Sequence, residues 1–391
     1  MVDAVRSARV KEALAQAGLD ALICRLAENV LFLTGYWPRN GFSFVVFPRD
    51  GDPILIVPEG ERHWAEPSGL RDIRTFGWGQ IKDTDPVDAI AAHLESLAPV
   101  VGKAVIGYEG RFEFVAPAHM AGEIIVSGEP TRSLLATSLP QATLREATDF
   151  LHTLRADKTE YEIGKIRLAN EVACLGLNAF KESVVPGRTE AQVAAAVVSA
   201  IHAQGVGYKG AQSVWAWPLV MSGLNTANSH RPYLISTTKP LAAGDLVLLE
   251  LGTVVDGYWS DLTRTHVVGR PTDRQLEIFD AVSAAQRAAI AALKPGAREV
   301  DVDRAARGII EERGLGPYFV HHTGHGLGFR YHEPTPFLHP KAQGIVREGM
   351  VTSVEPGVYI EGWGGLRVED DVVVRPAGGE VLSVFDTHLV A

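Results

Sequence analysis

The chain has 391 residues, of which 46% are hydrophobic and 21% are charged, a composition typical of globular proteins with enough apolar material for two cores. The net charge of −10 argues against non-specific binding to nucleic acid or to anionic membranes. The sequence holds no apolar run of the ~18 residues that a membrane span needs. Because Cys24 and Cys174 are the two cysteines and lie far apart, we expect a reduced, cytoplasmic protein without a membrane or nucleic-acid partner.

The first 150 residues alternate predicted helices and strands. The N-terminal stretch has apolar residues at helical spacing but no unbroken apolar core, which indicates an amphipathic helix and no signal sequence. A hairpin, a second helix and a further strand are predicted after it. These elements are expected over residues 1–24 (helix), 41–58 (hairpin), 88–98 (helix) and 103–110 (strand). The first 150 residues therefore predict an α/β domain with its own core.

The pattern changes near residue 150, and we place a domain boundary there, with 1–150 and 151–391 as the two units. Long helices follow, and their first residues match the capping box, in which a threonine is followed three residues later by Glu or Gln. Thr159 starts one such helix and Thr189 another, and a third is predicted over 271–296. Strands rich in Val, Leu and Gly lie between and after them, so the fold class is α/β (α+β).

Acids and histidines are concentrated in five short stretches beyond residue 220. The stretches and their side chains are SGLNTANSHRP with His230, LLELGTVVDGYWSDLTRT with Glu250 and Asp261, VHHTGHGLGFRYHEP with His321, His322, His325, His332 and Glu333, VTSVEPGVYI with Glu355, and GGLRVEDDVVV with Glu369 and Asp370. Taken singly, each acid is more often a surface or hairpin residue, and each histidine is more often structural. Spacing alone does not bring the five stretches together in space.

The acids become informative because three of them occupy predicted apolar strands. Side chains alternate between the faces of a strand, so Glu250, Glu355 and Glu369 should point into a core or a cleft. Ionised carboxylates there are costly unless they are paired or bind a metal. Carboxylate oxygens and imidazole suit Mn, Co, Zn or Fe, and two ions that share carboxylates would activate a water for attack on a carbonyl.

Together and in this order, the five stretches resemble the pita-bread metallopeptidase family of Xaa-Pro aminopeptidases, prolidases and methionine aminopeptidases, with creatinase as a relative that lacks metal. The resemblance covers the whole chain. It implies a creatinase-type N-terminal α/β domain, a C-terminal pita-bread catalytic domain and a homodimer.

The resemblance also implies a ligand set for two metal ions. The implied ligands are Glu250, Asp261, His325, Glu355 and Glu369. Asp261 and Glu369 would bridge the two ions, His325 and Glu355 would complete one of them, and Glu250 would complete the other. Glu355 would in addition exchange protons with the attacking water as a general base.

Other residues are implied to surround the substrate. His230 and His332 would contact the substrate carbonyl and the leaving amine and steady the tetrahedral intermediate. His321 would line the same cleft. Arg367, two residues before Glu369 on the same strand face, would reach the site and brace its acids.

Two positions depart from the family pattern. Position 250 is usually Asp, and Glu reaches one methylene further, which leaves open whether the chain holds two ions, one ion or none. Arg330 stands where many relatives carry an acid, and it would either hold a substrate carboxylate or form a surface salt bridge. The aromatic residues of 214–218 would either wall a substrate pocket or pack in the core. By analogy with the family, Arg39 would reach into the cleft of a neighbouring subunit.

The sequence therefore predicts a metallopeptidase that cleaves a peptide or amide bond in a small substrate, with Xaa-Pro as the favoured bond. One or two divalent ions per chain are expected, manganese first, with cobalt, zinc or iron as alternatives. One competing hypothesis is a creatinase-like C–N hydrolase, or a lyase of a small zwitterion, with a single or altered metal site. Another is a binding module that kept the fold and lost catalysis. Aminopeptidase and dipeptidase are not separated by the residues alone.

Overall fold

A computed structural model describes residues 3–39, 42–78, 86–111, 128–231 and 235–389. The chain divides into two compact units that meet between Arg155 and Ala156. Among the described residues, no helix combines the length and the apolar character needed to cross a membrane.

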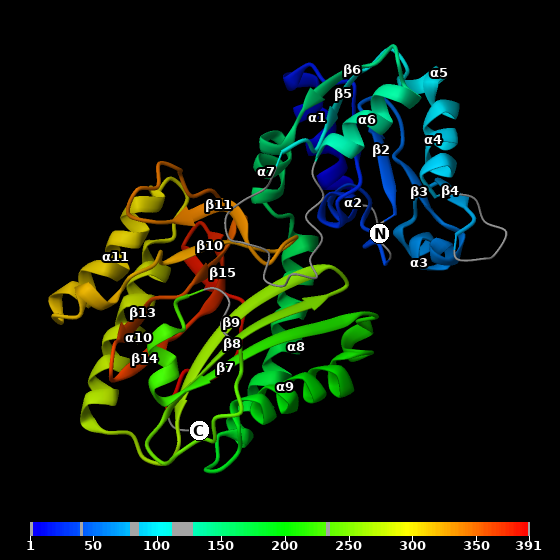
Figure 1. Ribbon diagram of the computed structural model, residues 1–391. Helices are drawn as coiled ribbons and strands as arrows, with labels where there is room; N and C mark the ends of the chain where they lie inside the picture. The colour runs from blue at the N-terminus through cyan, green and yellow to red at the C-terminus, as the bar shows by residue number, and fades with distance from the viewer. Residues whose placement is uncertain (1–2, 40–41, 79–85, 112–127, 232–234, 390–391) are drawn as a thin grey trace. The chain divides into compact units, whose positions relative to one another are not determined.

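The N-terminal unit is built on a six-stranded mixed sheet with the strand order β4-β3-β2-β1-β5-β6 (Figure 1). Its strands are β1 Ala21–Cys24, β2 Phe44–Pro48, β3 Ile54–Pro58, β4 Asp72–Phe76, β5 Val105–Tyr108 and β6 Thr143–Glu146. Its helices are α1 Ala4–Ala17, α2 Ala27–Thr34, α3 Arg62–Ala65, α4 Pro86–Ser96, α5 Ala98–Val101, α6 Gly128–Ser138 and α7 Thr148–Ala156. The antiparallel pairing of β2 with β3 confirms the predicted hairpin, and α4 and β5 confirm the second helix and the further strand. The helix expected over residues 1–24 is confirmed only as α1, because Ala21–Cys24 form strand β1.

The C-terminal unit contains four long helices. They are α8 Glu160–Ser183, α9 Glu190–Gly205, α10 Asp273–Ala292 and α11 Glu299–Glu312. Thr159, Thr189 and Thr272 each cap a helix through a reciprocal capping box, in which the threonine hydroxyl accepts from a backbone N–H three residues on. The predicted helix starts are therefore confirmed, together with their physical cause.

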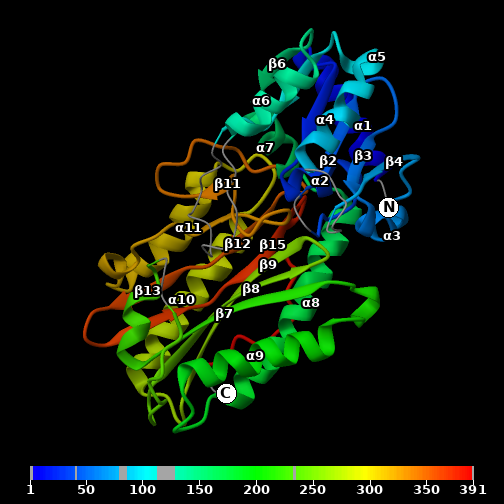
Figure 2. The same cartoon turned by 45° about the vertical axis from the view of Figure 1, so that its right-hand side comes forward.

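The strands of the C-terminal unit form three sheets. The first holds β7 Val214–Ser222, β8 Leu246–Val255 and β9 Tyr258–Val267 in antiparallel order. The second has the order β11-β10-β12-β15-β16, with β10 Gly324–Gly326, β11 Glu333–Leu338, β12 Val351–Val354, β15 Asp370–Arg375 and β16 Gly378–Val381. The third pairs β13 Gly357–Ile360 with β14 Gly364–Arg367. In two views, α8 and α9 lie along one face of the first sheet (Figures 1 and 2).

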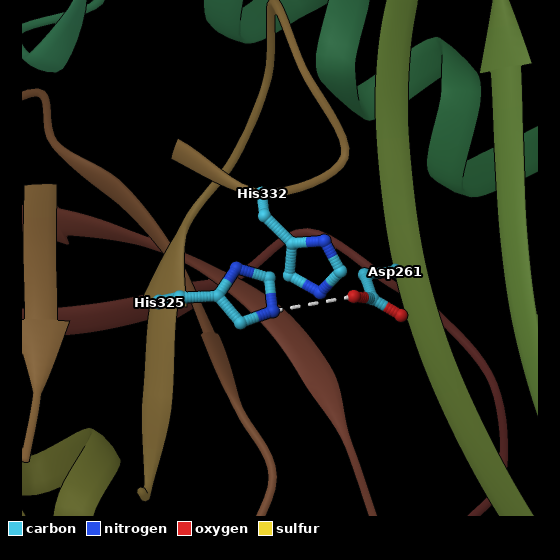
Figure 3. A group of neighbouring side chains, drawn as sticks. All are labelled: Asp261, His325 and His332. Carbon is cyan, nitrogen blue, oxygen red and sulfur yellow. Dashed lines mark ion pairs between the residues drawn. The ribbon is translucent and has the colours of Figure 1, made fainter. Parts of the chain in front are cut away.

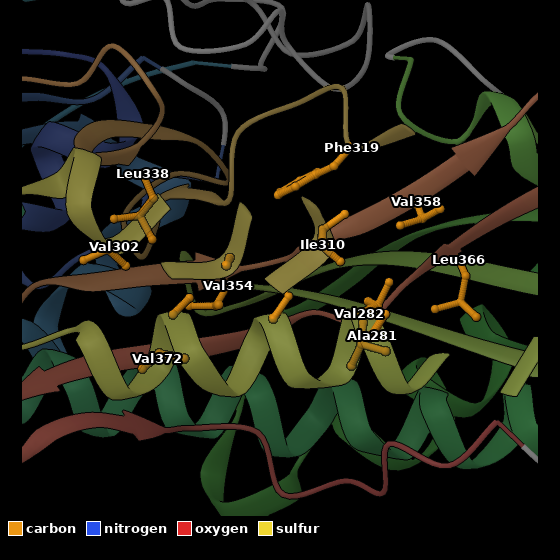
Figure 4. Packing of buried hydrophobic residues seen from close by; sticks show 14 of the residues in the cluster. Ala281, Val282, Val302, Ile310, Phe319, Leu338, Val354, Val358, Leu366 and Val372 are labelled. Atoms are coloured by element: carbon orange, nitrogen blue, oxygen red, sulfur yellow. The ribbon is translucent and has the colours of Figure 1, made fainter. Parts of the chain in front are cut away.

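Two apolar clusters hold this unit together. One joins α8 and α9 to the first sheet, and the other joins α10 and α11 to the second and third sheets (Figure 4). Members of the latter include Ala281, Val282, Val302, Ile310, Val354, Val358, Leu366 and Val372. With helices packed on the outer faces, the facing sides of the sheets remain available for polar side chains, and the acids and histidines of the site lie on them.

A tight hairpin sets the positions of the first two acids. Strands β8 and β9 turn at Asp256 and Gly257, whose φ angles of 50° and 90° are those of a two-residue turn in which both central residues have positive φ. The pairing of Val255 with Tyr258 fixes the register of the whole ladder.

Candidate metal centre

Glu250 and Asp261 project from the same face of the β8–β9 hairpin. Glu250 lies directly opposite Thr263, and Asp261 lies opposite Gly252. Cross-strand partners and residues two apart share a face, so Glu250, Asp261 and Thr263 all point the same way. The side chain of Asp261 is buried.

Glu355 and Glu369 lie at strand ends, and the prediction that they sit within strands is wrong. Glu355 follows β12, and its backbone N–H donates to the carbonyl of Thr323 at 2.8 Å. Glu369 lies between β14 and β15, and its N–H donates to the carbonyl of Thr263 at 3.2 Å. The chain passes from one sheet to another at both points, which interrupts the ladder and points both acids at the first hairpin. The prediction for Glu250, in β8, is confirmed.

His325, on β10, faces the acids. Its Nε2 lies 3.4 Å from Oδ2 of Asp261 (Figure 3). The same nitrogen lies 3.5 Å from Oε1 of Glu355. Its Nδ1 lies 2.9 Å from the carbonyl of Gly326, which can only accept, so Nδ1 carries the proton and the Nε2 lone pair points at the carboxylates. This is the tautomer that a metal-binding histidine requires.

The side chains form three groups of three whose ligand atoms lie within 4.8 Å of one another. The groups are Asp261 with His325 and His332, His325 with Glu355 and Glu369, and Glu250 with Asp261 and Glu369. Oε1 of Glu369 is buried and has no hydrogen-bond partner among the described residues. An unpaired carboxylate oxygen inside an acid cluster is costly, and a divalent cation would satisfy it, so these residues fit a metal ion.

The electrostatics of the cluster agree with that fit. Burial, followed by repulsion from Glu369, raises the pKa of Asp261 well above its usual range. The same two causes raise the pKa of Glu355. Burial lowers the pKa of His325, which keeps its imidazole neutral and able to bind metal. A cation among these groups would reverse the carboxylate shifts.

Glu250 contacts a phenol and a guanidinium, and each of these groups also reaches another acid: the Tyr331 hydroxyl lies 2.8 Å from Oδ1 of Asp261, and Nε of Arg367 lies 3.9 Å from Oε2 of Glu369. Oε1 of Glu250 lies 2.8 Å from the hydroxyl of Tyr331, and its Oε2 forms an ion pair with the guanidinium of Arg367. Arg367 also donates from Nε to Oγ1 of Thr263 at 2.9 Å. The Thr263 hydroxyl donates to Oε2 of Glu369 at 2.6 Å. Arg367 is therefore held among protein groups, and its bracing role stays a prediction.

His230 and His321 both contact one tyrosine, Tyr359. The ring of His230 is 5.0 Å from that of Tyr359, and Nε2 of His321 lies 2.9 Å from the Tyr359 hydroxyl. Burial lowers the pKa of His321 to about 4. His321 is therefore neutral at physiological pH, and its Nδ1 lies 4.0 Å from Oε2 of Glu355.

His332 stands beside His325, with 4.3 Å between the two ring centroids, and Figure 3 shows both rings directed toward Asp261. Arg330 is in the same loop and half-buried, and its backbone carbonyl accepts from Gly328 at 3.1 Å. Arg39 belongs to the N-terminal unit, where it is exposed and its guanidinium lies 4.9 Å from the ring centroid of Trp64.

Sequence reasoning missed two contributors, Tyr331 and Thr263, and it named His322 without giving it a role. Tyr331 immediately precedes His332, but nothing in its spacing indicates that its hydroxyl reaches the hairpin. The position of Thr263 could have been predicted, because it follows Asp261 by two residues and so lies on the same face of the strand. His322 lies with Nδ1 3.6 Å from Oε1 of Glu355. In the aromatic stretch of β7, Trp217 stacks on Trp259 at 5.0 Å.

Residues 164–376 match the family described as Metallopeptidase family M24. The chain belongs to metallopeptidase family M24. Residues 6–155 match the Creatinase/Prolidase N-terminal domain. The expected fold, a creatinase-type N-terminal domain followed by the catalytic domain of this family, is confirmed. Membership of this metallopeptidase family implies divalent metal ions, which the acid cluster fits.

Relatives of the M24 chain match it over nearly its whole length. It is 31% identical to the Xaa-Pro dipeptidase of Pyrococcus furiosus over 373 residues, which are 95% of each chain. It is 33% identical to the probable dipeptidase PepE of Mycobacterium tuberculosis over 382 residues, 96% of this chain and 93% of that one. The crystal structure of the prolidase from Pyrococcus horikoshii OT3 superposes with a TM-score of 0.78 at 27% identity, covering 99% of this chain and 100% of that chain.

Proposed function

We propose that this M24 chain is a metal-dependent dipeptidase that hydrolyses Xaa-Pro dipeptides. The observation that carries the proposal is the convergence of buried ligands from four separate segments. These are Asp261, His325, Glu355 and Glu369. The names of its relatives, Xaa-Pro dipeptidase, dipeptidase and prolidase, support the substrate class and favour a dipeptidase over an aminopeptidase.

Manganese is the metal that we propose. Several carboxylate oxygens and one imidazole make a hard donor set that suits Mn²⁺, with cobalt, zinc or iron as alternatives. When bound, the divalent ion supplies Lewis-acid activation of water and of the peptide carbonyl. The chain itself supplies the enclosure, because Asp261, His325 and Glu369 are each almost fully buried.

Glu355 is the proposed proton carrier. Its Oε1 accepts a hydrogen bond from Ser353 at 3.2 Å, and its Oε2 faces the Nδ1 of His321 at 4.0 Å. These contacts hold the carboxylate at the edge of the ligand cluster, where it would take the proton of the attacking water and return it to the leaving amine.

Three further side chains are proposed to position the dipeptide. His332 stands beside His325 and would donate to the developing oxyanion or to the leaving nitrogen. His230, beside Tyr359, would contact the substrate from the opposite segment. Arg330 would bind the free carboxylate of the dipeptide as a bidentate pair, which would explain a preference for dipeptides over longer chains.

We also propose that the protein is a cytoplasmic homodimer. Both cysteines are free thiols, which suits a reducing compartment. The dimer follows from the family resemblance, as does the role of Arg39 at a neighbouring subunit's cleft. Light scattering of the purified chain tests the dimer, and Arg39→Ala should raise KM for dipeptides without changing the metal content.

The test is a substrate panel with metal-loaded protein. Xaa-Pro dipeptides should be hydrolysed, whereas Xaa-Ala dipeptides, Xaa-Pro-Yaa tripeptides and creatine should be poor substrates. Asp261→Ala should abolish turnover, and Asp280→Ala, an exposed aspartate of the same unit, should leave it unchanged. Cleavage of creatine-like amides alone would favour the creatinase-like hypothesis, and efficient cleavage of tripeptides would favour an aminopeptidase.

A further inference from the structure

The hydroxyl of Tyr331 bridges two acids of the centre. It lies 2.8 Å from Oε1 of Glu250 and 2.8 Å from Oδ1 of Asp261. A phenol O–H is a neutral donor at ordinary pH, and it occupies the region between these two carboxylates where an ion held by both would have to sit. Tyr331 therefore competes with a metal for the Glu250 side of the centre.

The ring of Tyr331 packs directly against the backbone of the hairpin at a glycine, Gly252. A Cβ at position 252 would come within 2.7 Å of Cε2 of Tyr331, so Gly252 leaves the space that the ring fills. The ring of Trp259 packs 5.6 Å away on the same side. Because Tyr331 is buried between these neighbours, its hydroxyl cannot swing away from the acids without moving the loop that carries it.

Arg367 pairs with the second carboxylate oxygen of Glu250, Oε2. Its guanidinium forms an ion pair with Glu250 and donates to Thr263 at 2.9 Å and to the Tyr359 hydroxyl at 3.1 Å. A further contact, at 3.3 Å, reaches the carbonyl of Ser229. The guanidinium is buried and anchored on several sides, so it is a fixed cation next to Glu250.

The two sides of the centre therefore differ. Oε2 of Glu250 pairs with Arg367, and its Oε1 shares the single proton of the Tyr331 phenol with Asp261, whereas Oε1 of Glu369 has no partner in the part of the chain that the structure describes. Nε2 of His325 presents a lone pair toward Asp261 and Glu355. The ligand atoms of Glu369 and His325 are therefore available to a metal ion, whereas the carboxylate of Glu250 is already paired with the guanidinium of Arg367.

We infer that Glu250 is an anchor for Tyr331 and Arg367 rather than a metal ligand, and that each chain binds one catalytic divalent ion on Asp261, His325, Glu355 and Glu369. The Arg367 guanidinium already offsets the charge of the Glu250 carboxylate, so a dication is needed only for the remaining acids, Asp261, Glu355 and Glu369. The extra methylene of Glu250, relative to the usual aspartate, carries its carboxylate out to the guanidinium and the phenol. The inference rests on the metal centre of the proposed function.

The experiment counts Mn²⁺ on the full-length chain. Metal-free protein is equilibrated by dialysis against increasing Mn²⁺, bound metal is measured by inductively coupled plasma mass spectrometry, and the loaded sample is examined by electron paramagnetic resonance. Wild type should saturate at one ion per chain and give the six-line signal of an isolated Mn²⁺. Glu250→Gln should also bind one ion, with a Kd within about threefold of wild type, whereas Asp261→Asn should lose it.

Saturation at two ions, or the multiline signal of a coupled Mn²⁺ pair, would overturn the inference from the wild-type protein alone, whether or not the variants fold. A single ion whose affinity falls tenfold or more in folded Glu250→Gln would also overturn it, because Glu250 would then be a ligand. The dipeptide assay is independent of this count. Two bound ions together with dipeptide hydrolysis would refute the inference and support the proposed function. One bound ion without dipeptide hydrolysis would support the inference and refute the proposed function.

Discussion

A buried ion pair fixes the loop that carries His332, and its removal should cost stability as well as activity. Nζ of Lys158 lies 2.5 Å from Oε2 of Glu333, and the two side chains are 0% and 2% exposed. The other carboxylate oxygen of Glu333 accepts from the backbone N–H of Phe329 at 2.9 Å. Because Glu333 directly follows His332, the pair links the start of α8 to the catalytic loop.

The magnitude follows from burial. Lys158→Met leaves the Glu333 carboxylate buried without its cation, which should lower the free energy of unfolding by about 3–5 kcal/mol. Combining it with Glu333→Gln removes both charges and keeps an acceptor for the N–H of Phe329. The double variant should therefore be more stable than the sum of the two single variants predicts, with a coupling energy of about 2–3 kcal/mol.

Urea unfolding of wild type, both single variants and the double variant measures that coupling. Lys209→Met is the control, because Lys209 pairs with Glu171 at a comparable 2.6 Å but is 59% exposed, and its replacement should cost much less stability than that of Lys158. Additive single effects, to within about 0.5 kcal/mol, would refute the reasoning. So would a cost for Lys158→Met no larger than that of the surface control.

Three further changes probe the centre and the core. Thr263→Val removes the hydroxyl that donates to Glu369 at 2.6 Å, and Mn²⁺ affinity measured by equilibrium dialysis should fall about 10–100-fold, so an unchanged affinity would count against this support. Gly252→Ala places a Cβ 2.7 Å from the ring of Tyr331, which should cost about 1–3 kcal/mol in thermal unfolding, and an unshifted midpoint would show that the ring has room to move. Burial lowers the pKa of His266 to about 4 from about 6.5 in the unfolded chain, so the unfolded state takes up the proton first and stability is lost as pH falls from about 6.5 to about 4. Wild type should lose up to about 3 kcal/mol more than His266→Gln across that range, and parallel pH profiles of the two proteins would contradict the buried neutral histidine.

Local signals in the sequence predicted much of the fold. The three threonine capping boxes marked helix starts correctly, because capping depends on residues within one turn. The hairpin over 41–58 was equally local. The register of β8 with β9 is set just as locally, by the Asp256–Gly257 turn, although this turn was not among the predicted elements.

What the sequence could not predict depends on contacts between distant segments. Glu355 and Glu369 were expected inside strands, but the chain changes sheets at both residues, and no local pattern marks that change. The contact of Tyr331 with Glu250 joins residues 81 apart and depends on the space above Gly252. The ion pair between Arg367 and Glu250 likewise appears only once β8 and β14 are placed together. These long-range contacts give position 250 its chemistry.

The central claim is metal-dependent hydrolysis of Xaa-Pro dipeptides by this centre, and one measurement tests it most directly. Turnover of an Xaa-Pro dipeptide is followed in metal-free protein, before and after Mn²⁺ is added, for wild type and Asp261→Ala. Metal-free wild type should be inactive and should regain turnover with Mn²⁺, while Asp261→Ala stays inactive at every Mn²⁺ concentration. Full turnover by the metal-free protein, or by folded Asp261→Ala, would contradict the claim.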